Sequence, residues 1–342
     1  MPFRGHIPHC LPFRRSYATV HSPLIFAKPP VSPPHTSTPR HLDRFILETL
    51  ANTPPAGRTA LPQLIQQYLD RSANVLDAQL PYEPHPSPSR RVSFSADKRG
   101  DVYLIAHVVR ESDRNRITVS SGFTLETSDG QCILVTCAHT LEEIRWSPLL
   151  VLPNVPHHSS PPELSHARSS GSFILSTVDS TPTAHPIASV LSSLHRPDLI
   201  LLSPFPMRAP LRSLPISPYP VPAGTPIRAH FVSETRPKED GWQPWIGTTW
   251  SKWVQGTVLG YRDFSGREAV PGTYDALSHM LFQPLPTTGS SGGPIVDEST
   301  GAVVGVMLGT RMDSSIEGVR GWGVPAETIF EMFSLPGVTL KG

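Results

Sequence analysis

Residues 287–296 read Thr-Thr-Gly-Ser-Ser-Gly-Gly-Pro-Ile-Val, a turn of small residues immediately before an apolar strand. Glycines on both sides of Ser291 let the backbone adopt conformations that a side chain would forbid. A serine held in such a turn can be exposed while its own amide and a neighbouring amide point at one spot. A nucleophile and its oxyanion hole need this geometry. Gly/Ser turns between strands are common, so a purely structural turn remains the alternative for this segment alone.

A second stretch, residues 132–141, reads Cys-Ile-Leu-Val-Thr-Cys-Ala-His-Thr-Leu, an apolar strand that runs into His139. Together the two stretches resemble the chymotrypsin-like (trypsin-fold) serine proteases. In that family Thr-Ala-Ala-His carries the general base and a later Gly-x-Ser-Gly-Gly-Pro carries the nucleophile. The match spans roughly the last two thirds of the chain, and the conjunction is far more specific than either half. The resemblance implies that His139 is the base and Ser291 the nucleophile.

The family places an aspartate between these two residues in the chain. Asp198 is the better candidate, because it opens the apolar run Leu199-Ile200-Leu201-Leu202. Asp179 is the rival, but no apolar strand follows it. The acid must be partly buried to hold the imidazole in one tautomer, which favours Asp198.

Other site residues follow from the same resemblance. The backbone amides of Gly289 and Ser291 would form the oxyanion hole, and Cys137 replaces a motif alanine and is expected to be buried packing. In trypsin-like zymogens an aspartate before the nucleophile pairs with a newly cut N-terminus. Here that position is Ser290, which carries no charge. We therefore expect activity that does not depend on cleavage inside the protease domain.

The resemblance also predicts the substrate-binding residues. Leu285, six residues before the nucleophile, would line the base of the pocket for the side chain preceding the scissile bond. Residues Leu308, Gly309 and Thr310 would pair with the substrate backbone. An unpaired cation against leucine is costly to bury, so we expect cleavage after aliphatic or small apolar residues. If Arg or Lys were preferred before the scissile bond, Asp313 or Glu317 would have to pair with that cationic side chain.

Composition limits the function classes. The chain has 342 residues, 38% of them hydrophobic, and a net charge of +1, which gives no reason to expect a nucleic-acid partner. No apolar run is long enough to cross a bilayer. The adjacent His157 and His158 lack a third ligand at sensible spacing, so neither a metal nor another cofactor is expected. The expected partner is a polypeptide substrate.

The first 42 residues are basic and contain no Asp or Glu; their cations are Arg4, Arg14, Arg15, Lys28 and Arg40. This composition, with a possible processing site after Tyr17, indicates a mitochondrial presequence over residues 1–30. A disordered basic tail is the alternative, since several prolines weaken the amphipathic helix that such signals need.

Two cysteines, Cys132 and Cys137, follow the expected presequence. They lie at odd spacing on one predicted strand, so their side chains would point to opposite faces and are not expected to form a disulfide. An intracellular rather than secreted setting fits this cysteine usage.

Residues 31–95 are predicted to be a Pro-rich linker with two helices. Apolar residues at helical spacing occur before and after Pro54-Pro55-Ala56-Gly57; they are Leu42, Phe45, Ile46, Leu50, Leu61, Leu64, Ile65, Tyr68, Leu69 and Leu76. These stripes would either cover the back of the protease domain or dock a protein partner.

From about residue 100 the sequence turns to short β-rich runs, with a hairpin signal at Asp129-Gly130. With the resemblance, they predict a mainly β fold of two six-stranded antiparallel barrels of trypsin-like type over residues 96–338. The first barrel would span about 96–205 and the second about 223–335, ending in an amphipathic helix over 326–333. The Gly-Val-Pro run at 323–325 resembles HtrA-type members, here expected without their PDZ domain.

Four tryptophans, Trp242, Trp245, Trp250 and Trp253, lie close together in the second predicted barrel. An aromatic core under an inserted loop is the simpler explanation, and a binding surface is the alternative.

The sequence therefore predicts a serine endopeptidase that works through His139, Asp198 and Ser291 and an acyl-enzyme. Two alternatives stay open. One is a catalytically inactive trypsin-fold binding or scaffold protein, because motifs do not report geometry. The other is a different acyl hydrolase, against which the order of the residues counts, since the Gly-x-Ser-x-Gly hydrolases place their acid and histidine after the serine.

Overall fold

The computed structural model describes residues 40–94, 101–150, 168–178, 181–207 and 211–335. All of them belong to one compact unit of the chain. The expected presequence and the residues Asp179, His157 and His158 lie outside the described residues, so the expectations about them stay predictions. Within the described part of the chain, no helix has the length and apolarity needed to span a bilayer.

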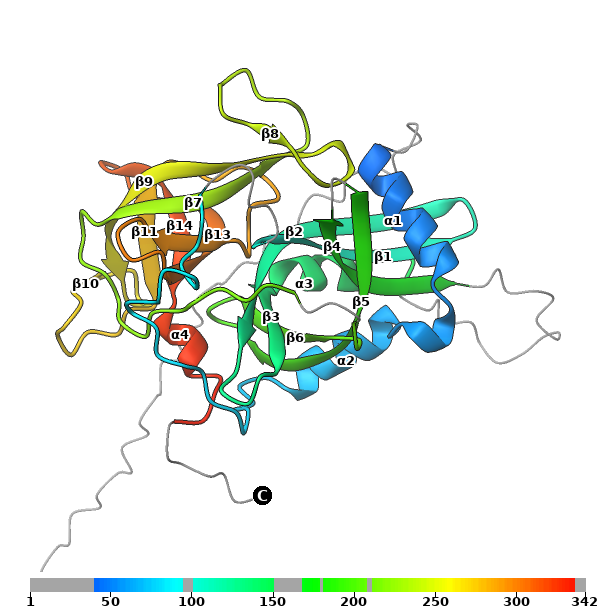
Figure 1. The fold of residues 1–342 in the computed structure, drawn as a ribbon, viewed down its shortest axis with the longest axis horizontal. Coiled ribbons are helices and arrows are strands. Elements are labelled where there is room, and N and C mark those ends of the chain that lie inside the picture. The colour runs from blue at the N-terminus through cyan, green and yellow to red at the C-terminus, as the bar shows by residue number, and fades with distance from the viewer. Residues whose placement is uncertain (1–39, 95–100, 151–167, 179–180, 208–210, 336–342) are drawn as a thin grey trace, which may run out of the picture. The chain divides into compact units, whose positions relative to one another are not determined.

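The first half of the protein is a closed antiparallel barrel with the strand order β1-β2-β3-β6-β5-β4 (Figure 1). Pairing of β4 with β1 closes it. Its strands are β1 (Tyr103–Glu111), β2 (Arg114–Glu126), β3 (Cys132–Cys137), β4 (Ser169–Val178), β5 (Thr181–Leu194) and β6 (Leu199–Pro204). The short helix α3 (His139–Arg145) follows β3 directly. The hairpin between β2 and β3 turns at Gly130, whose φ of +84° suits glycine, as the Asp-Gly pair predicted.

The second half repeats this architecture. Six strands follow one another as β7-β9-β11-β14-β13-β12, and pairing of β12 with β7 closes the ring. Counted in chain order, this is the strand order of the first barrel. The elements are β7 (Pro226–Ser233), β8 (Gln243–Pro244), η2 (Ile246–Thr248), β9 (Trp250–Arg262), β10 (Glu268–Ala269), β11 (His279–Gln283), β12 (Pro294–Asp297), β13 (Val303–Ser314), β14 (Gly318–Pro325) and α4 (Glu327–Phe330). The two-barrel prediction is confirmed.

Apolar side chains fill both barrels and also the seam between them. The seam brings Phe123, Val135 and Leu201 of the first barrel against Val296, Val306 and Val324 of the second. Ile329 and Phe333, from the segment after β14, join the same cluster. The two barrels therefore share one continuous apolar cluster, which holds them against each other.

Residues 40–94 pack against the barrels. Helix α1 (His41–Asn52) lies against β1 and β4, and α2 (Leu61–Asp70) lies against β5, with η1 (Pro55–Gly57) between the helices (Figure 1). The apolar stripes of the helices face inward, since Ile46, Leu50, Leu61 and Leu64 are each at most 1% exposed. The stripes predicted from helical spacing thus cover the protease-like barrels.

The segment after α2 crosses to the far end of the chain. The Leu76 N–H donates to the Met332 carbonyl at 2.9 Å, and the Ser334 N–H donates to the Leu76 carbonyl at 2.9 Å. Further along, the Val92 N–H donates to the Gly301 carbonyl at 3.0 Å. These bonds join the early segment to the residues after α4 and to the turn between β12 and β13.

Two helix predictions need correction for this reason. Leu76 does not continue the stripe of α2, which ends at Asp70, because Leu76 is in extended pairing with Phe333. The helix expected over 326–333 is only four residues long, since the same pairing takes up the backbone beyond it.

Strands β4 and β5 were not predicted, because they are rich in Ser and Thr and β5 contains Pro182 and Pro186.

The four tryptophans are partly buried and pack at separate places, and no single aromatic core joins them all. The ring of buried His230 lies between Trp245 and Trp253, at centroid distances of 5.0 and 5.1 Å. Trp242 packs against the interior of the second barrel, and Trp250 lies beneath the Arg236 guanidinium.

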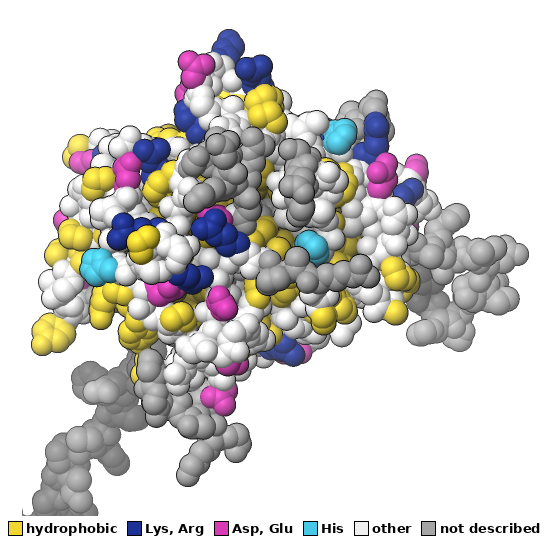
Figure 2. Space-filling view, viewed as in Figure 1, with side chains coloured by type: hydrophobic (Ala, Val, Ile, Leu, Met, Phe, Trp, Pro, Cys, Tyr) yellow, Lys and Arg dark blue, Asp and Glu magenta, His cyan; other side chains and the backbone are white. Residues whose placement is uncertain are grey.

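The face drawn in Figure 2 carries basic and acidic side chains side by side, in keeping with the net charge of +1.

The described residues include three buried histidines, of which His107 in the first barrel and His230 in the second are the least exposed, at 1% and 5%. Burial lowers the pKa of His107 to about 4 and that of His230 to about 3, because the charged imidazolium would lose its hydration. Both rings are therefore neutral in the folded protein at neutral pH.

We expect the free energy of unfolding to fall as the pH is lowered from about 6.5 towards 4. In the unfolded chain both imidazoles bind protons below about pH 6.5, whereas the folded protein keeps them neutral, so each contributes a slope of about 1.4 kcal/mol per pH unit. Denaturant titrations across this range measure the slope. His230→Phe keeps a ring between the two tryptophans without a titrating group, and it should remove one histidine's share; an unchanged slope would contradict the assignment.

Candidate active site

Strand pairing brings His139 and Asp198 together. His139 opens α3 directly after β3, Asp198 immediately precedes β6, and Cys137 of β3 pairs with Leu199 of β6. The His139 Nδ1 atom lies 2.6 Å from Asp198 Oδ2. The other carboxylate oxygen accepts the backbone N–H groups of Ala138 and His139 at 3.0 and 2.7 Å. The structure thus joins the predicted base and acid in one hydrogen-bonded unit.

Backbone strain helps to place this carboxylate. Asp198 has a φ of +58°, in the left-handed region that few residues other than glycine adopt. Its own carbonyl accepts the Ala138 N–H at 3.0 Å. Such a conformation costs about 1–3 kcal/mol and persists where the surroundings over-determine it. Here the three bonds to the Ala138 and His139 amides hold Asp198 in place.

Ser291 lies on the loop 287–293 between β11 and β12 of the second barrel. Gly289 and Gly292 on either side have φ values of +88° and +82°. The Ser291 carbonyl accepts the Ser121 N–H of β2 at 2.8 Å, so the loop is docked on the first barrel. Gly292 is required there, because a Cβ would lie 2.2 Å from the Ser121 carbonyl oxygen.

The Ser291 hydroxyl is bonded to β13 and not to the histidine. Its Oγ donates to the Leu308 carbonyl of β13 at 2.8 Å. No hydrogen bond joins Ser291 to His139 in the structure, although both are described residues. In the absence of substrate, catalytic hydrogen bonds are often long or poorly aligned. Rotation about the serine Cα–Cβ bond is enough to release this hydroxyl.

Two backbone amides of the loop are free to bind an anion. Within the described residues, neither the Gly289 N–H nor the Ser291 N–H donates to a protein acceptor. Neighbouring groups are paired: the Ser290 N–H donates to the Thr287 carbonyl and the Gly293 N–H to the Ser290 carbonyl. The Thr287 and Thr288 N–H groups also have no acceptor among the described residues, so it is the sequence motif that singles out Gly289 and Ser291 as the expected oxyanion-hole pair.

Cys137 takes part in the site, which the sequence did not predict. It is buried, as expected for packing, but its Sγ lies 3.7 Å from His139 Nε2. The pKa of His139 is raised, first by its electrostatic interaction with Cys137 and then by the hydrogen bond and charge of Asp198. The signal was present in the sequence, since a titratable cysteine replaces the family's alanine two residues before the base.

Replacing this cysteine should change the titration of the histidine. We expect Cys137→Ala to lower the pKa of His139, because a group that favours the charged imidazolium is removed while Asp198 remains. NMR titration of the His139 ring in both proteins measures the difference. An unchanged value would show that Asp198 alone sets the pKa of this histidine.

The predicted backbone-binding strand has an open edge. Residues 303–306 of β13 pair with β12, whereas Gly309 and Thr310 pair only with β14 among the described strands. An extended peptide could therefore add along Leu308–Thr310. Leu285 is 49% exposed and lies between β11 and β12.

The nearby acids are already paired. Asp313 receives two hydrogen bonds from the Arg262 guanidinium, at 2.9 and 2.8 Å, and its side chain is 7% exposed. Glu317 forms an ion pair with Arg320. Neither acid is free to pair with a cationic substrate side chain unless it leaves its arginine.

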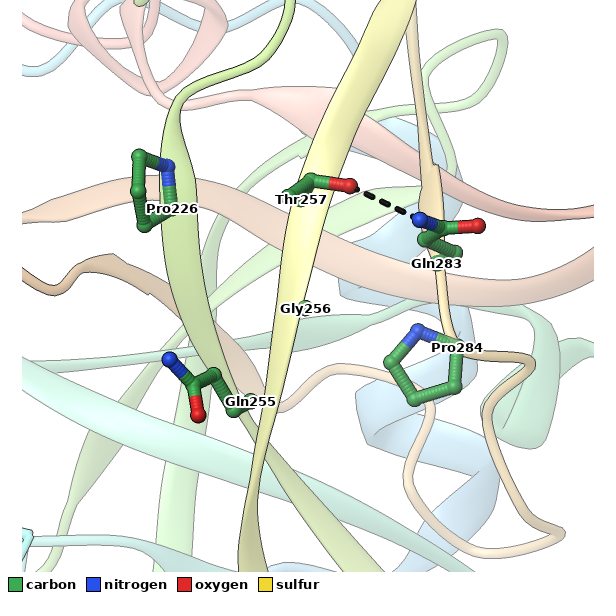
Figure 3. Close-up of a pocket in the computed structure, with 6 residues that line it drawn as sticks. All are labelled: Pro226, Gln255, Gly256, Thr257, Gln283 and Pro284. Carbon is green, nitrogen blue, oxygen red and sulfur yellow. Dashed lines mark hydrogen bonds between the residues drawn. The ribbon is translucent and has the colours of Figure 1, made fainter.

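A separate cavity of about 460 Å³ is lined by residues of β7, β9 and the end of β11 (Figure 3). It is lined by Pro226, Gln255, Gly256, Thr257, Gln283 and Pro284, and the Gln283 amide donates to the Thr257 hydroxyl at 3.0 Å. Neither the triad nor Leu285 is part of its lining. Among the described residues, no three His, Cys, Asp or Glu side chains are grouped as a metal site would need.

Comparison with known proteins finds structural likeness only. No family model and no curated protein matches the chain. Three similar solved structures each share 15% identity with it. Deg5 has a TM-score of 0.42 over 68% of this chain and 86% of its own. The MamO protease domain from Magnetospirillum magneticum has 0.39 over 68% and 96%. The inactive form of Rv3671c from M. tuberculosis H37Rv has 0.37 over 73% and 93%.

With TM-scores below 0.5, these likenesses carry no argument about activity. The architecture itself is clear from two six-stranded barrels with the same strand order and a candidate site that draws residues from both. The chain has a trypsin-like fold. Within this trypsin-like fold, His139 and Asp198 come from the first barrel and Ser291 from the second.

Proposed function

We propose that the protein is a serine endopeptidase that uses His139, Asp198 and Ser291. The observation that carries the proposal is the 2.6 Å contact between His139 Nδ1 and Asp198 Oδ2, in a carboxylate fixed by two further amides. Such a pair holds one imidazole tautomer. The proposal takes Nε2 as the base, and in the structure this nitrogen lies 3.7 Å from Cys137 Sγ. The loop carrying Ser291 is docked on β2, the strand next to the one that leads into His139.

The chemistry follows from these positions. Ser291 Oγ leaves the Leu308 carbonyl and attacks a peptide carbonyl carbon while His139 Nε2 takes its proton. Asp198 stabilises the imidazolium that forms, and His139 then gives the proton to the leaving amine. Water hydrolyses the resulting acyl-enzyme by the same route. The Gly289 and Ser291 amides would stabilise the tetrahedral oxyanion, each by about 3 kcal/mol.

Covalent labelling tests this proposal. A fluorophosphonate should label the wild-type protein at Ser291, and Ser291→Ala should abolish labelling, whereas the exposed control Ser299→Ala should leave it intact. Asp198→Asn should lower kcat for a peptide substrate by about 10⁴-fold, because the histidine is then held in the wrong tautomer. Peptide mapping identifies the labelled residue. A wild-type protein that is folded but neither labelled nor active would contradict the proposal.

A binding or scaffold protein without turnover is the second candidate. The observation that favours it is the hydrogen bond from Ser291 Oγ to the Leu308 carbonyl, which leaves the serine unpaired with His139. A protein of this kind would bind peptides along β13 without labelling at Ser291. The labelling experiment separates the two functions.

We also propose that cleavage follows aliphatic or small apolar residues. Leu285 offers an apolar surface, and Asp313 and Glu317 are occupied by Arg262 and Arg320. Burying an aliphatic side chain there would gain about 2 kcal/mol, whereas an unpaired cation would lose its hydration.

A peptide-library cleavage profile tests this preference. We expect aliphatic residues to dominate the position before the cut, and Leu285→Asp to shift the profile towards Lys and Arg. A wild-type profile dominated by Lys or Arg would overturn the assignment of Leu285 to the pocket.

A further inference from the structure

Ser290 is held in a closed ring of hydrogen bonds. Its side chain is 0% exposed, and its Oγ accepts the Val232 N–H of β7 at 2.9 Å. The Thr287 hydroxyl donates to the Val232 carbonyl at 2.6 Å and lies 2.9 Å from Ser290 Oγ. Because the proton of Thr287 is committed to that carbonyl, Ser290 must be the donor to Thr287.

The donors and acceptors of this ring form one complete circuit. The Val232 N–H donates to Ser290, Ser290 donates to Thr287, and Thr287 donates back to the Val232 carbonyl. Hydrogen bonds in such a circuit polarise one another and are strengthened in a buried site. The ring joins the start of the nucleophile loop and the residue beside Ser291 to a single residue of β7.

Ser121 holds the opposite side of the loop. Its Oγ donates to the Gly289 carbonyl at 2.8 Å, and its N–H donates to the Ser291 carbonyl at 2.8 Å. Ser121 belongs to β2 of the first barrel and is 0% exposed. The loop also carries its own internal bond: the Ser290 carbonyl, which shares a peptide unit with the Ser291 N–H, accepts the Gly293 N–H at 3.0 Å. Together these bonds fix the loop backbone from which the unpaired Gly289 and Ser291 N–H groups project.

We propose that Ser290, Thr287 and Ser121 are positioning residues that hold the two oxyanion-hole amides in their working orientation without any charged group. This inference rests on the proposed serine endopeptidase function and deepens it. The ring occupies the place where trypsin-like zymogens use a charged aspartate paired with a new N-terminus. A neutral ring needs no cleavage to form and does not titrate, so it holds the loop equally at acidic and neutral pH.

Loss of the ring should act on the transition state. Ser290→Ala leaves the buried Val232 N–H without its acceptor, which frees the loop to move. Donors to an oxyanion contribute mainly after the carbonyl has been attacked, so kcat should fall about 10–100-fold while KM changes less than about threefold. Thr287→Val, which keeps the shape and removes the hydroxyl, should act in the same direction, as should Ser121→Ala.

The experiment uses the full chain, with peptide hydrolysis measured between pH 6 and 9. A peptide boronic acid, which forms a tetrahedral adduct with the serine, serves as a probe of the oxyanion hole. Its affinity should fall in Ser290→Ala in parallel with kcat, and Ser290→Thr should restore both. The fall in kcat should be the same at every pH, because the ring has no titratable group. The control is Ser192→Ala, which removes a serine hydroxyl that is equally buried but lies on β5, outside the ring and the loop. This variant should keep full kcat.

The outcomes separate the inference from the function on which it rests. A folded wild-type protein that neither hydrolyses peptide nor binds the boronic acid overturns the proposed function. An active wild type, with Ser290→Ala and Thr287→Val both at full kcat, overturns the positioning role alone. If thermal melting shows that Ser290→Ala is unfolded, Thr287→Val and Ser290→Thr decide between the two results.

Discussion

The candidate site depends on one close approach between the two barrels, at Gly292. A Cβ at this position would lie 2.2 Å from the Ser121 carbonyl oxygen and 2.4 Å from Thr136 Oγ1, so only glycine lets the loop dock on β2 and β3. The residues proposed as nucleophile and base are adjacent to this contact in the chain. Ser291 immediately precedes Gly292, and His139 follows the end of β3. This backbone contact therefore fixes the relative placement of the two segments that carry the proposed residues.

Around this contact the support is built mainly from neutral hydroxyl groups. Thr136 Oγ1 donates to the Ser121 carbonyl at 2.6 Å, and Ser120 lies within hydrogen-bond distance of Thr136 and Thr140. Buried hydroxyls can satisfy backbone groups without the desolvation that a buried charge would suffer. The sulfur of Cys137 is the exception, since it lies against the imidazole nitrogen on which the proposed chemistry depends.

The barrels could be predicted from the sequence because local patterns indicate their strands, and the contact between His139 and Asp198 was predicted in the same way. The role of Ser291 stays a prediction. The apolar strands that lead into His139 and out of Asp198, and the glycines around Ser291, each have a physical reason that a short window contains. Strands β4 and β5 were not predicted because their Ser- and Pro-rich composition does not favour a strand. They are extended because they pair with neighbouring strands of the barrel. The ring at Ser290 and the contact of Cys137 with His139 depend on atoms brought together only by tertiary packing. For the same reason the helix expected over 326–333 gave way to pairing with Leu76, a partner remote in sequence.

That pairing has a consequence for the order in which the protein can fold. The segment around Leu76 is synthesised before either barrel, yet its backbone partners, Met332 and Ser334, come after the last strand of the second barrel. Contacts so distant in sequence close late and slow the search for the native state. Synthesis runs at about 5–20 residues per second, so the early segment waits on the order of ten seconds or more before its partner has emerged from the ribosome. During that interval the apolar positions of this segment lack their final cover, and a chaperone that shields them would protect the nascent chain from aggregation.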